Sequence, residues 1–272
     1  MSDLPILGAA LNLNSFETHR ELMLEKPRDL ELQDFWSPNV LNGDWMPLIE
    51  RARTLLDGHK GRLGIHGPFI GLSMAEPDPD VRDVVKKRLR QGLEICEALG
   101  ATQMVVHSPD SAWSYYNLDL YDNGRERHME TCHLTMKDAV RQAEDIGCEL
   151  VLENIEDMDP SSRLKMAESF GSEAVKVSLD TGHAHYVHGV NGAPPVDYFV
   201  KAAGNNLRHV HLQDADGYAD RHWTLGEGTI NWRAVFAALG KLTSNPRLII
   251  EIRDHAGLPA SIANMAALGL AQ

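Results

Sequence analysis

The sequence predicts an α/β fold, a single (β/α)8 barrel with its active site at the carboxyl ends of the strands. Short apolar runs alternate eight times with longer amphipathic stretches along the 272 residues. The runs are almost wholly apolar, as expected of parallel strands that are buried on both faces. Most of them end at a histidine, an aspartate or a glutamate. Eight such units in a chain of this length fit a closed barrel.

The expected elements alternate between strand and helix. The expected strands are 6–13, 29–34, 61–66, 103–107, 149–153, 174–179, 207–211 and 247–252. The expected helices are 45–56, 80–99, 126–146, 161–170, 196–203, 232–239 and 259–268. Gly100 and Gly147 follow the two longest helices, in the position where a left-handed residue commonly ends a helix. This alternation implies parallel strands joined by right-handed crossovers.

A doubly wound open sheet is the alternative architecture. It would concentrate polar strand ends near one switch point, whereas here they follow most of the strands. No linker, low-complexity run or strong repeat divides residues 1–272, so we expect one domain.

The composition is ordinary for a soluble globular protein, with 43% hydrophobic and 24% charged residues. The formal net charge of −13 disfavours nucleic acid and anionic membranes as partners. The N-terminal residues lack the pattern of a signal peptide, and no apolar run is long enough for a membrane span. We therefore expect a cytoplasmic protein, and a homo-oligomer is compatible with the sequence. Cys96, Cys132 and Cys148 form no C-x-x-C pair and are expected as small buried side chains.

Nine residues of the types that bind divalent metals lie at or just beyond these runs. They are His66, His107, Glu153, Asp180, His183, His211, Asp220, His222 and Glu251. In a barrel, residues that follow successive strands point toward a common axis. A mixture of imidazoles and carboxylates suits Mn²⁺, Zn²⁺, Co²⁺ or Fe²⁺ better than Ca²⁺. The sequence therefore predicts a metal centre at the mouth of the barrel.

The two glutamates at strand ends are the candidate catalytic residues. Glu153 lies in Leu152-Glu153-Asn154, and Glu251 lies in Ile249-Ile250-Glu251. Carboxylates on non-adjacent strands can face each other across a substrate, so that one removes a proton and the other returns it.

Two motifs place further ligands close together. In Asp180-Thr181-Gly182-His183, we expect Gly182 to permit a tight turn that returns His183 to the mouth. In the segment 220–228, Asp220 and His222 fall on one side of an extended loop. Gly226 and Gly228 are expected to let that loop approach a ligand closely. His185 and His188 are expected in a solvent-facing loop, and His209 as a core histidine beneath His211.

Aromatic and acidic residues near the strand ends are candidates for binding the substrate. Loops that contain Trp113 and Trp223 are expected to cover the mouth and to select the substrate. The others are Phe69 in the His66-Gly67-Pro68-Phe69 run, Asp214 after the seventh strand, and Glu227 in the glycine-containing loop.

Taken together, these motifs resemble the xylose isomerase-like TIM-barrel superfamily. They are Ile65-His66-Gly67-Pro68-Phe69, Leu152-Glu153-Asn154, Leu179-Asp180-Thr181-Gly182-His183, His211-Leu212-Gln213-Asp214 and the segment 220–228. The superfamily includes sugar phosphate isomerases and epimerases, inosose dehydratases and endonuclease IV. The resemblance covers nearly the whole chain.

The resemblance implies two competing assignments. The ketose epimerase branch binds one ion through residues that match Glu153, Asp180, His211 and Glu251, and its two glutamates transfer the proton. Endonuclease IV binds three zinc ions, and all nine of its ligands have a counterpart. The set His66, His107 and Glu153 matches one ion, the epimerase-like set a second, and His183, Asp220 and His222 a third.

The chain departs from endonuclease IV where that family holds DNA. The A-H-x-S-x-x-G-G run after the first strand is replaced by Ala10-Leu11-Asn12-Leu13-Asn14-Ser15-Phe16. The basic and aromatic loop after the second strand is replaced by the acidic segment 29–36, in which Glu31 and Gln33 resemble the isomerase branch.

The main hypothesis is therefore a sugar or sugar-phosphate isomerase or epimerase that uses one to three divalent ions (Mn²⁺, Zn²⁺, Co²⁺ or Mg²⁺). It would proceed through a metal-stabilised enediolate, with proton transfer by Glu153 and Glu251. The alternative is a multinuclear zinc phosphoesterase that resembles endonuclease IV.

Overall fold

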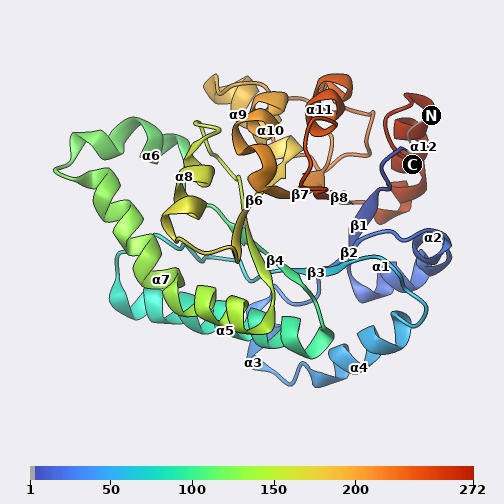
Figure 1. The fold of residues 1–272 in the computed structure, drawn as a ribbon, viewed down its shortest axis with the longest axis horizontal. Helices are drawn as coiled ribbons and strands as arrows, with labels where there is room; N and C mark the ends of the chain where they lie inside the picture. Colours follow the sequence, from blue (N-terminus) through green and yellow to red (C-terminus); the bar gives the residue numbers. More distant parts are fainter. Residues whose placement is uncertain (1–3) are drawn as a thin grey trace.

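The computed structural model describes residues 4–272 and contains a closed parallel barrel (Figure 1). Each strand pairs in parallel with the next along the chain, and the last strand pairs with the first. The strands are β1 (Gly8–Leu11), β2 (Leu30–Leu32), β3 (Leu63–His66), β4 (Gln103–His107), β5 (Glu149–Glu153), β6 (Val175–Asp180), β7 (Leu207–Leu212) and β8 (Arg247–Ile250). All eight expected strands are confirmed, as is the (β/α)8 fold.

The expected helices surround this barrel. They are α4 (Met46–Leu55), α5 (Pro79–Leu99), α7 (Gly124–Ile146), α8 (Ser162–Ser169), α10 (Val196–Ala203), α11 (Trp232–Leu239) and α12 (Leu258–Ala267). Gly100 and Gly147 end α5 and α7 with φ angles of 69° and 67°, so both predicted left-handed ends are confirmed. No helix within residues 4–272 is long and apolar enough to cross a membrane.

Five helices were not expected from the sequence. They are α1 (Leu13–Thr18), α2 (Arg20–Glu25), α3 (Pro38–Asn42), α6 (Ala112–Asn117) and α9 (Thr181–Asn191), and short 3-10 turns lie at 118–120, 204–206 and 255–257. Four of these helices are too short to show a clear apolar period. The longer α9 contains glycines and histidines, which are weak helix formers. His185 and His188 therefore lie on a helix and not in the expected loop.

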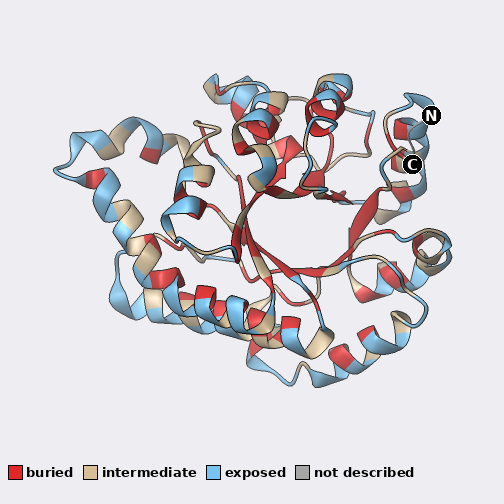
Figure 2. Cartoon of the chain, viewed as in Figure 1, coloured by how far each residue is buried: buried red, intermediate tan, exposed pale blue. Residues whose placement is uncertain are grey.

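The core lies on both sides of the strands, inside the barrel and between the barrel and its helices. Figure 2 shows buried strands and helices that expose their outer faces. The three cysteines are buried and free, as expected for small apolar side chains. Several buried polar residues lie at the carboxyl ends of the strands, among them the candidate ligands His66, Glu153, Asp180, His211 and Glu251.

Asp34, in the loop after β2, makes the stability of this end of the barrel depend on pH. Its Oδ2 accepts a hydrogen bond from the Leu13 amide at the start of α1 (2.9 Å). Burial raises the pKa of Asp34 to about 6. Because this is above the pKa of the unfolded chain, the resulting stability is complete below about pH 4 and is lost as the pH rises through 6.

We expect Asp34→Asn to stabilise the protein at pH 8 by on the order of 1 kcal/mol, after allowance for partial exposure of the side chain. The asparagine keeps an acceptor for Leu13 but does not ionise. Near pH 4 the variant and the parent should be equally stable. Urea unfolding at both pH values checks this, and a variant that is less stable at pH 8 would show that the ionised form is favoured.

Candidate metal centre

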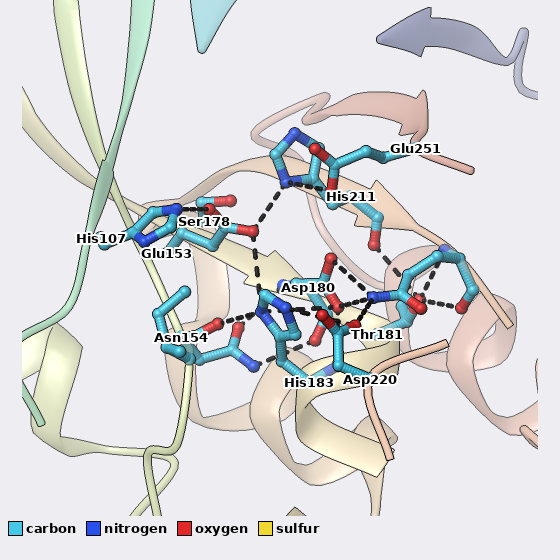
Figure 3. A network of polar contacts seen from close by, with 12 residues as sticks. His107, Glu153, Asn154, Ser178, Asp180, Thr181, His183, His211, Asp220 and Glu251 are labelled. Carbon is cyan, nitrogen blue, oxygen red and sulfur yellow. Dashed lines mark hydrogen bonds and ion pairs between the residues drawn. The ribbon is translucent and has the colours of Figure 1, made fainter. Parts of the chain in front are cut away.

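All nine candidate ligands gather at the carboxyl end of the barrel. Figure 3 labels all of these ligands except His66 and His222, and shows them converging from strands β4 to β8 and the segments that follow. The nine form three groups, and within each group one ligand atom per residue lies within 4.8 Å of the others. The inner group is Glu153, Asp180, His211 and Glu251; the histidine group is His66, His107 and Glu153; the loop group is His183, Asp220 and His222. Glu153 belongs to two of them.

The inner group is the most deeply buried. Glu153, Asp180 and His211 are at most 1% exposed, and Glu251 is 9% exposed. His211 Nδ1 lies 2.8 Å from Glu153 Oε1 and 3.5 Å from Glu251 Oε2. The amide of Gln33 donates to the other oxygen of Glu251 (2.6 Å). These strand-end side chains therefore converge on one point at the axis of the barrel.

The histidine group has the spacing of a metal site. Glu153 Oε2 lies 3.4 Å from His107 Nε2 and 3.7 Å from His66 Nε2, and the two imidazole nitrogens are 3.4 Å apart. Zinc bonds of about 2.0–2.1 Å in a tetrahedron separate the ligand atoms by about 3.4 Å. Among the described residues Glu153 Oε2 is buried without a hydrogen-bond partner. An ion bound here would satisfy that oxygen, so the residues fit a divalent metal.

The loop group is more open to solvent. Asp220 Oδ1 lies 3.5 Å from His183 Nε2 and 3.1 Å from His222 Nε2, and the Asp220 side chain is 44% exposed. The other two groups have only one side chain that is more than 12% exposed, His107 at 22%. An ion in the loop group would therefore be the one most accessible to solvent and to a substrate.

The histidines are oriented by their second nitrogens, as is usual for metal ligands. In three of them the Nδ1–H group donates to a backbone carbonyl, which leaves the Nε2 lone pair free for a metal. These bonds join His66 to Gly67 O (2.9 Å), His183 to Asn154 O (2.8 Å) and His222 to Glu251 O (3.2 Å).

Imidazole groups offset the negative charge of the buried carboxylates. Burial opposes the ionisation of Glu153, but His211 and His107 hold its pKa well below the usual range. Burial also opposes the charge on His211, yet Glu251 and Glu31 keep its pKa well above the usual range. Burial lowers the pKa of His107 to about 3, so that this imidazole is neutral and ready to ligate. Metal binding at neutral pH therefore has to displace protons from His211, and from His183 and His222, whose pKa values are also raised beside carboxylates.

The Asp180-x-x-His183 spacing reflects a helix start and not the tight turn expected from Gly182. Asp180 caps α9, and its Oδ1 accepts the backbone N–H of His183 (2.7 Å). Gly182 lies within the first turn of that helix. A Cβ there would lie 2.2 Å from the side chain of Gln213, so the glycine is needed for close packing.

Gln213 links the inner and loop groups, a role that the sequence did not reveal. Its amide nitrogen donates to Asp180 Oδ1 (3.2 Å) and Asp220 Oδ1 (2.9 Å), and its oxygen accepts the His222 N–H (2.8 Å). A side-chain amide has both donors and an acceptor, so it can bond two carboxylates and a backbone N–H group at the same time.

We expect Gly182→Ala to lower stability by about 1–3 kcal/mol, because the added methyl group overpacks against Gln213. The displaced Gln213 should also release Asp220, and the loop group should lose its ion. Urea unfolding and zinc content after desalting measure the two effects. Adding Gln213→Ala should restore part of the stability without restoring the ion. Normal zinc content in Gly182→Ala would contradict this role of Gln213.

Asp214 holds the glycine-containing loop 220–228 by hydrogen bonds and does not line the cavity. It is fully buried, and its Oδ2 accepts from Gly226 N (2.8 Å) and from Trp232 Nε1 (2.9 Å). A Cβ on Gly228 would lie 2.3 Å from Asp214 Oδ1. The close approach expected of Gly228 is thus made to Asp214 and not to a ligand.

A cavity of about 680 Å³ opens above the three groups. Of the five expected substrate-binding residues, only Phe69 is among the described residues that line it; Trp113, Trp223, Glu227 and Asp214 are not. Trp113 is 59% exposed on α6, away from the mouth. The lining residues that the sequence did not reveal are Gln33, Trp36, Ile155, Ile252, Arg253 and His255.

The known proteins that are similar to this chain include two curated relatives and a solved structure. An uncharacterised protein of Methanocaldococcus jannaschii is 28% identical over 219 residues, which cover 76% of this chain and 70% of that protein. A probable endonuclease 4 of Symbiobacterium thermophilum is 28% identical over 194 residues, which cover 65% of this chain and 66% of that protein. The crystal structure of a D-tagatose 3-epimerase-like protein has a TM-score of 0.74 at 24% identity, with 96% of both chains covered. The last of these shows a shared fold.

The family model of the xylose isomerase-like TIM barrel matches residues 10–268. This match spans all eight strands except the first two residues of β1. It agrees with the resemblance drawn from the strand-end motifs and with the observed closed barrel. The chain therefore belongs to the xylose isomerase-like TIM barrel family.

Proposed function

We propose that this chain is a multinuclear metal-dependent hydrolase of small phosphate esters. The observation that carries the proposal is the position of Glu153 between two groups of ligands. Its Oε1 lies 2.8 Å from His211 in the inner group, and its Oε2 lies 3.4 Å from His107 in the histidine group. A carboxylate shared in this way suits two ions a few ångströms apart, as in enzymes that cleave phosphate esters with two metals.

The same geometry weighs against Glu153 as a proton-transferring base. A general base must have a free atom within hydrogen-bond reach of the proton that it removes. Glu153 is 1% exposed, and both of its oxygens face imidazoles. The expected pair of glutamates is thus unequal: both line the cavity, but the Glu251 side chain is 12% exposed and that of Glu153 only 1%.

Charge favours an anionic substrate if all three groups are filled. The groups contain four carboxylates, those of Glu153, Asp180, Asp220 and Glu251. Three divalent ions with neutral imidazoles would leave a net charge of +2, which attracts a phosphate ester. With one ion in the inner group, the raised pKa values of His183 and His222 keep both imidazoles protonated, and the net charge would be close to zero. Bound divalent ions would activate a water molecule and offset the charge that develops on the phosphoryl oxygens.

The chain's own residues would shape the substrate site. Gln33 fixes the orientation of Glu251, while Trp36 and Phe69, with ring centroids 5.4 Å apart, form an aromatic wall. Arg253 is the only arginine or lysine among the described lining residues. A cavity of about 680 Å³ suits a small molecule, and the net charge of −13 disfavours duplex DNA.

An isomerase or epimerase of sugars is the second candidate. It is favoured by the inner group, which is complete without the other two and could hold a single ion. The exposed edge of Glu251, held by Gln33, would then face the substrate. With one ion the centre would be close to neutral, because His183 and His222 stay protonated, so this candidate suits an uncharged sugar.

Metal content and substrate preference together separate the candidates. The zinc- or manganese-loaded protein would be analysed for ions per chain and assayed with bis(p-nitrophenyl) phosphate, abasic duplex DNA and free ketohexoses. We expect three ions, hydrolysis of the small ester and loss of that activity in His107→Ala. Glu149→Gln, at the opposite end of β5, is the matched control. One ion per chain together with epimerisation that survives His107→Ala would overturn the hydrolase.

A further inference from the structure

We propose that Glu31 is the positioning residue of the metal centre, and that it sets which nitrogen of His211 faces the metal. Glu31 lies on β2 with its side chain 3% exposed inside the barrel. Its Oε1 lies 3.0 Å from His211 Nε2, and its Oε2 lies 3.1 Å from His209 Nε2. The inference rests on the metal centre proposed above but not on the reaction catalysed there.

Glu31, His209 and His211 also cluster closely enough to be considered as a fourth group of ligands. The orientation of His211 argues otherwise. Its Nε2 is within hydrogen-bond distance of Glu31 Oε1, at 3.0 Å. His211 already directs Nδ1 at the inner group. To ligate through Nε2 as well, its imidazole would have to lose both protons.

The proton positions follow from these contacts. The Nε2 of His211 lies 3.0 Å from a carboxylate oxygen of Glu31, whereas its Nδ1 is directed at the inner group. An ionised carboxylate only accepts, so His211 carries its proton on Nε2 and leaves the Nδ1 lone pair for a metal. This is the arrangement in which a buried carboxylate fixes the tautomer and raises the basicity of a ligating histidine.

His209 and Ser178 hold Glu31 in turn. His209 Nε2 lies 3.1 Å from Glu31 Oε2, a close contact that lacks the alignment of a hydrogen bond. The Nδ1 of His209 points to Ser178. Ser178 Oγ lies 2.8 Å from that Nδ1 and can donate its hydroxyl proton to it. Ser178 and His209 are at most 1% exposed. A chain of contacts thus runs from Ser178 through His209 and Glu31 to the ligand His211.

Glu31→Ala is expected to weaken the tightest-bound zinc 10–100-fold, measured by competition with a chromophoric chelator at constant pH. The number of ions at saturating zinc should stay the same. Thermal melting of the metal-free proteins would verify that the variant is folded. Glu149 is a half-buried glutamate at the other end of the barrel, and the control variant Glu149→Gln should bind zinc like the parent.

Glu31→Gln tests the tautomer itself. The glutamine oxygen can accept from His211, but its NH₂ group then faces His209. His209 can adapt by moving its proton to Nδ1 and donating to Ser178 Oγ. We therefore expect near-normal zinc affinity in Glu31→Gln and in Ser178→Ala, but at least tenfold weaker binding when the two are combined.

Two results would overturn the proposal. If Glu31→Ala binds zinc as tightly as the parent, Glu31 does not position His211. If the parent binds one more ion than Glu31→Ala at saturation, Glu31 is itself a ligand. Because both measurements report zinc binding alone, they stand even if the protein proves not to hydrolyse phosphate esters.

Discussion

Glu153→Gln is expected to reduce the bound zinc from three ions per chain to one and to lower phosphoester hydrolysis by on the order of 10³-fold. The reason is that one carboxylate serves both the inner and the histidine group. A glutamine offers one neutral oxygen and directs an NH₂ group at imidazole nitrogens that should bind metal. The loop group does not contain Glu153 and should keep its ion.

Metal analysis after desalting, together with the rate of ester hydrolysis, measures both effects. Asp220→Asn is the matched control, since it is an equally conservative change in a group that shares no ligand with the others. It should lose one ion only. Equal losses of zinc in the two variants would contradict the shared role of Glu153, as would a Glu153→Gln variant that retains three ions.

Removal of metal with a chelator at neutral pH is expected to lower the melting temperature by about 10 °C. An ion present at 1,000 times its dissociation constant stabilises the folded state by about 4 kcal/mol, and each kcal/mol corresponds to about 2–4 °C in a protein of this size. Without metal, buried carboxylates such as Glu153 and Asp180 depend on protonated imidazoles for compensation.

Thermal melting with and without chelator, followed by re-addition of zinc, measures this effect. The shift should shrink as the pH falls, because protons compete with the ion for His211 and the other imidazoles. Glu153→Gln should show a smaller shift than the parent. An unchanged melting temperature after complete removal of the metal would show that the folded protein gains nothing from ions at this site.

The barrel and the nine ligands could be predicted because they obey simple geometric rules. Parallel strands with both faces buried leave a nearly continuous apolar pattern, and the first polar residue after each strand marks the same rim. His107 and Glu153, for example, end adjacent strands that pair directly in the barrel. Such positions require only the strand boundaries to be known.

The supporting residues could not be predicted in this way. Gln213, Gln33 and Glu31 act through hydrogen bonds between distant segments. Glu31 and Gln33 resemble the isomerase branch and Gln213 lies in a family motif, but nothing in the local sequence shows which side chains they contact. The loops were also misjudged. Trp113 lies on the separate helix α6, and the cavity is lined instead by Trp36 and by residues after β8. Loop paths depend on tertiary packing more than on pattern.

Asp180 serves both the fold and the candidate metal centre. Asp180 accepts the His183 amide at the start of the helix and is also an inner-group ligand, so its loss would fray a helix as well as remove a ligand. His107 and Asp220 make no comparable contribution to a helix or strand end. A substitution at His107 or Asp220 would therefore change the metal centre alone, whereas one at Asp180 would change the metal centre and weaken the start of α9 together.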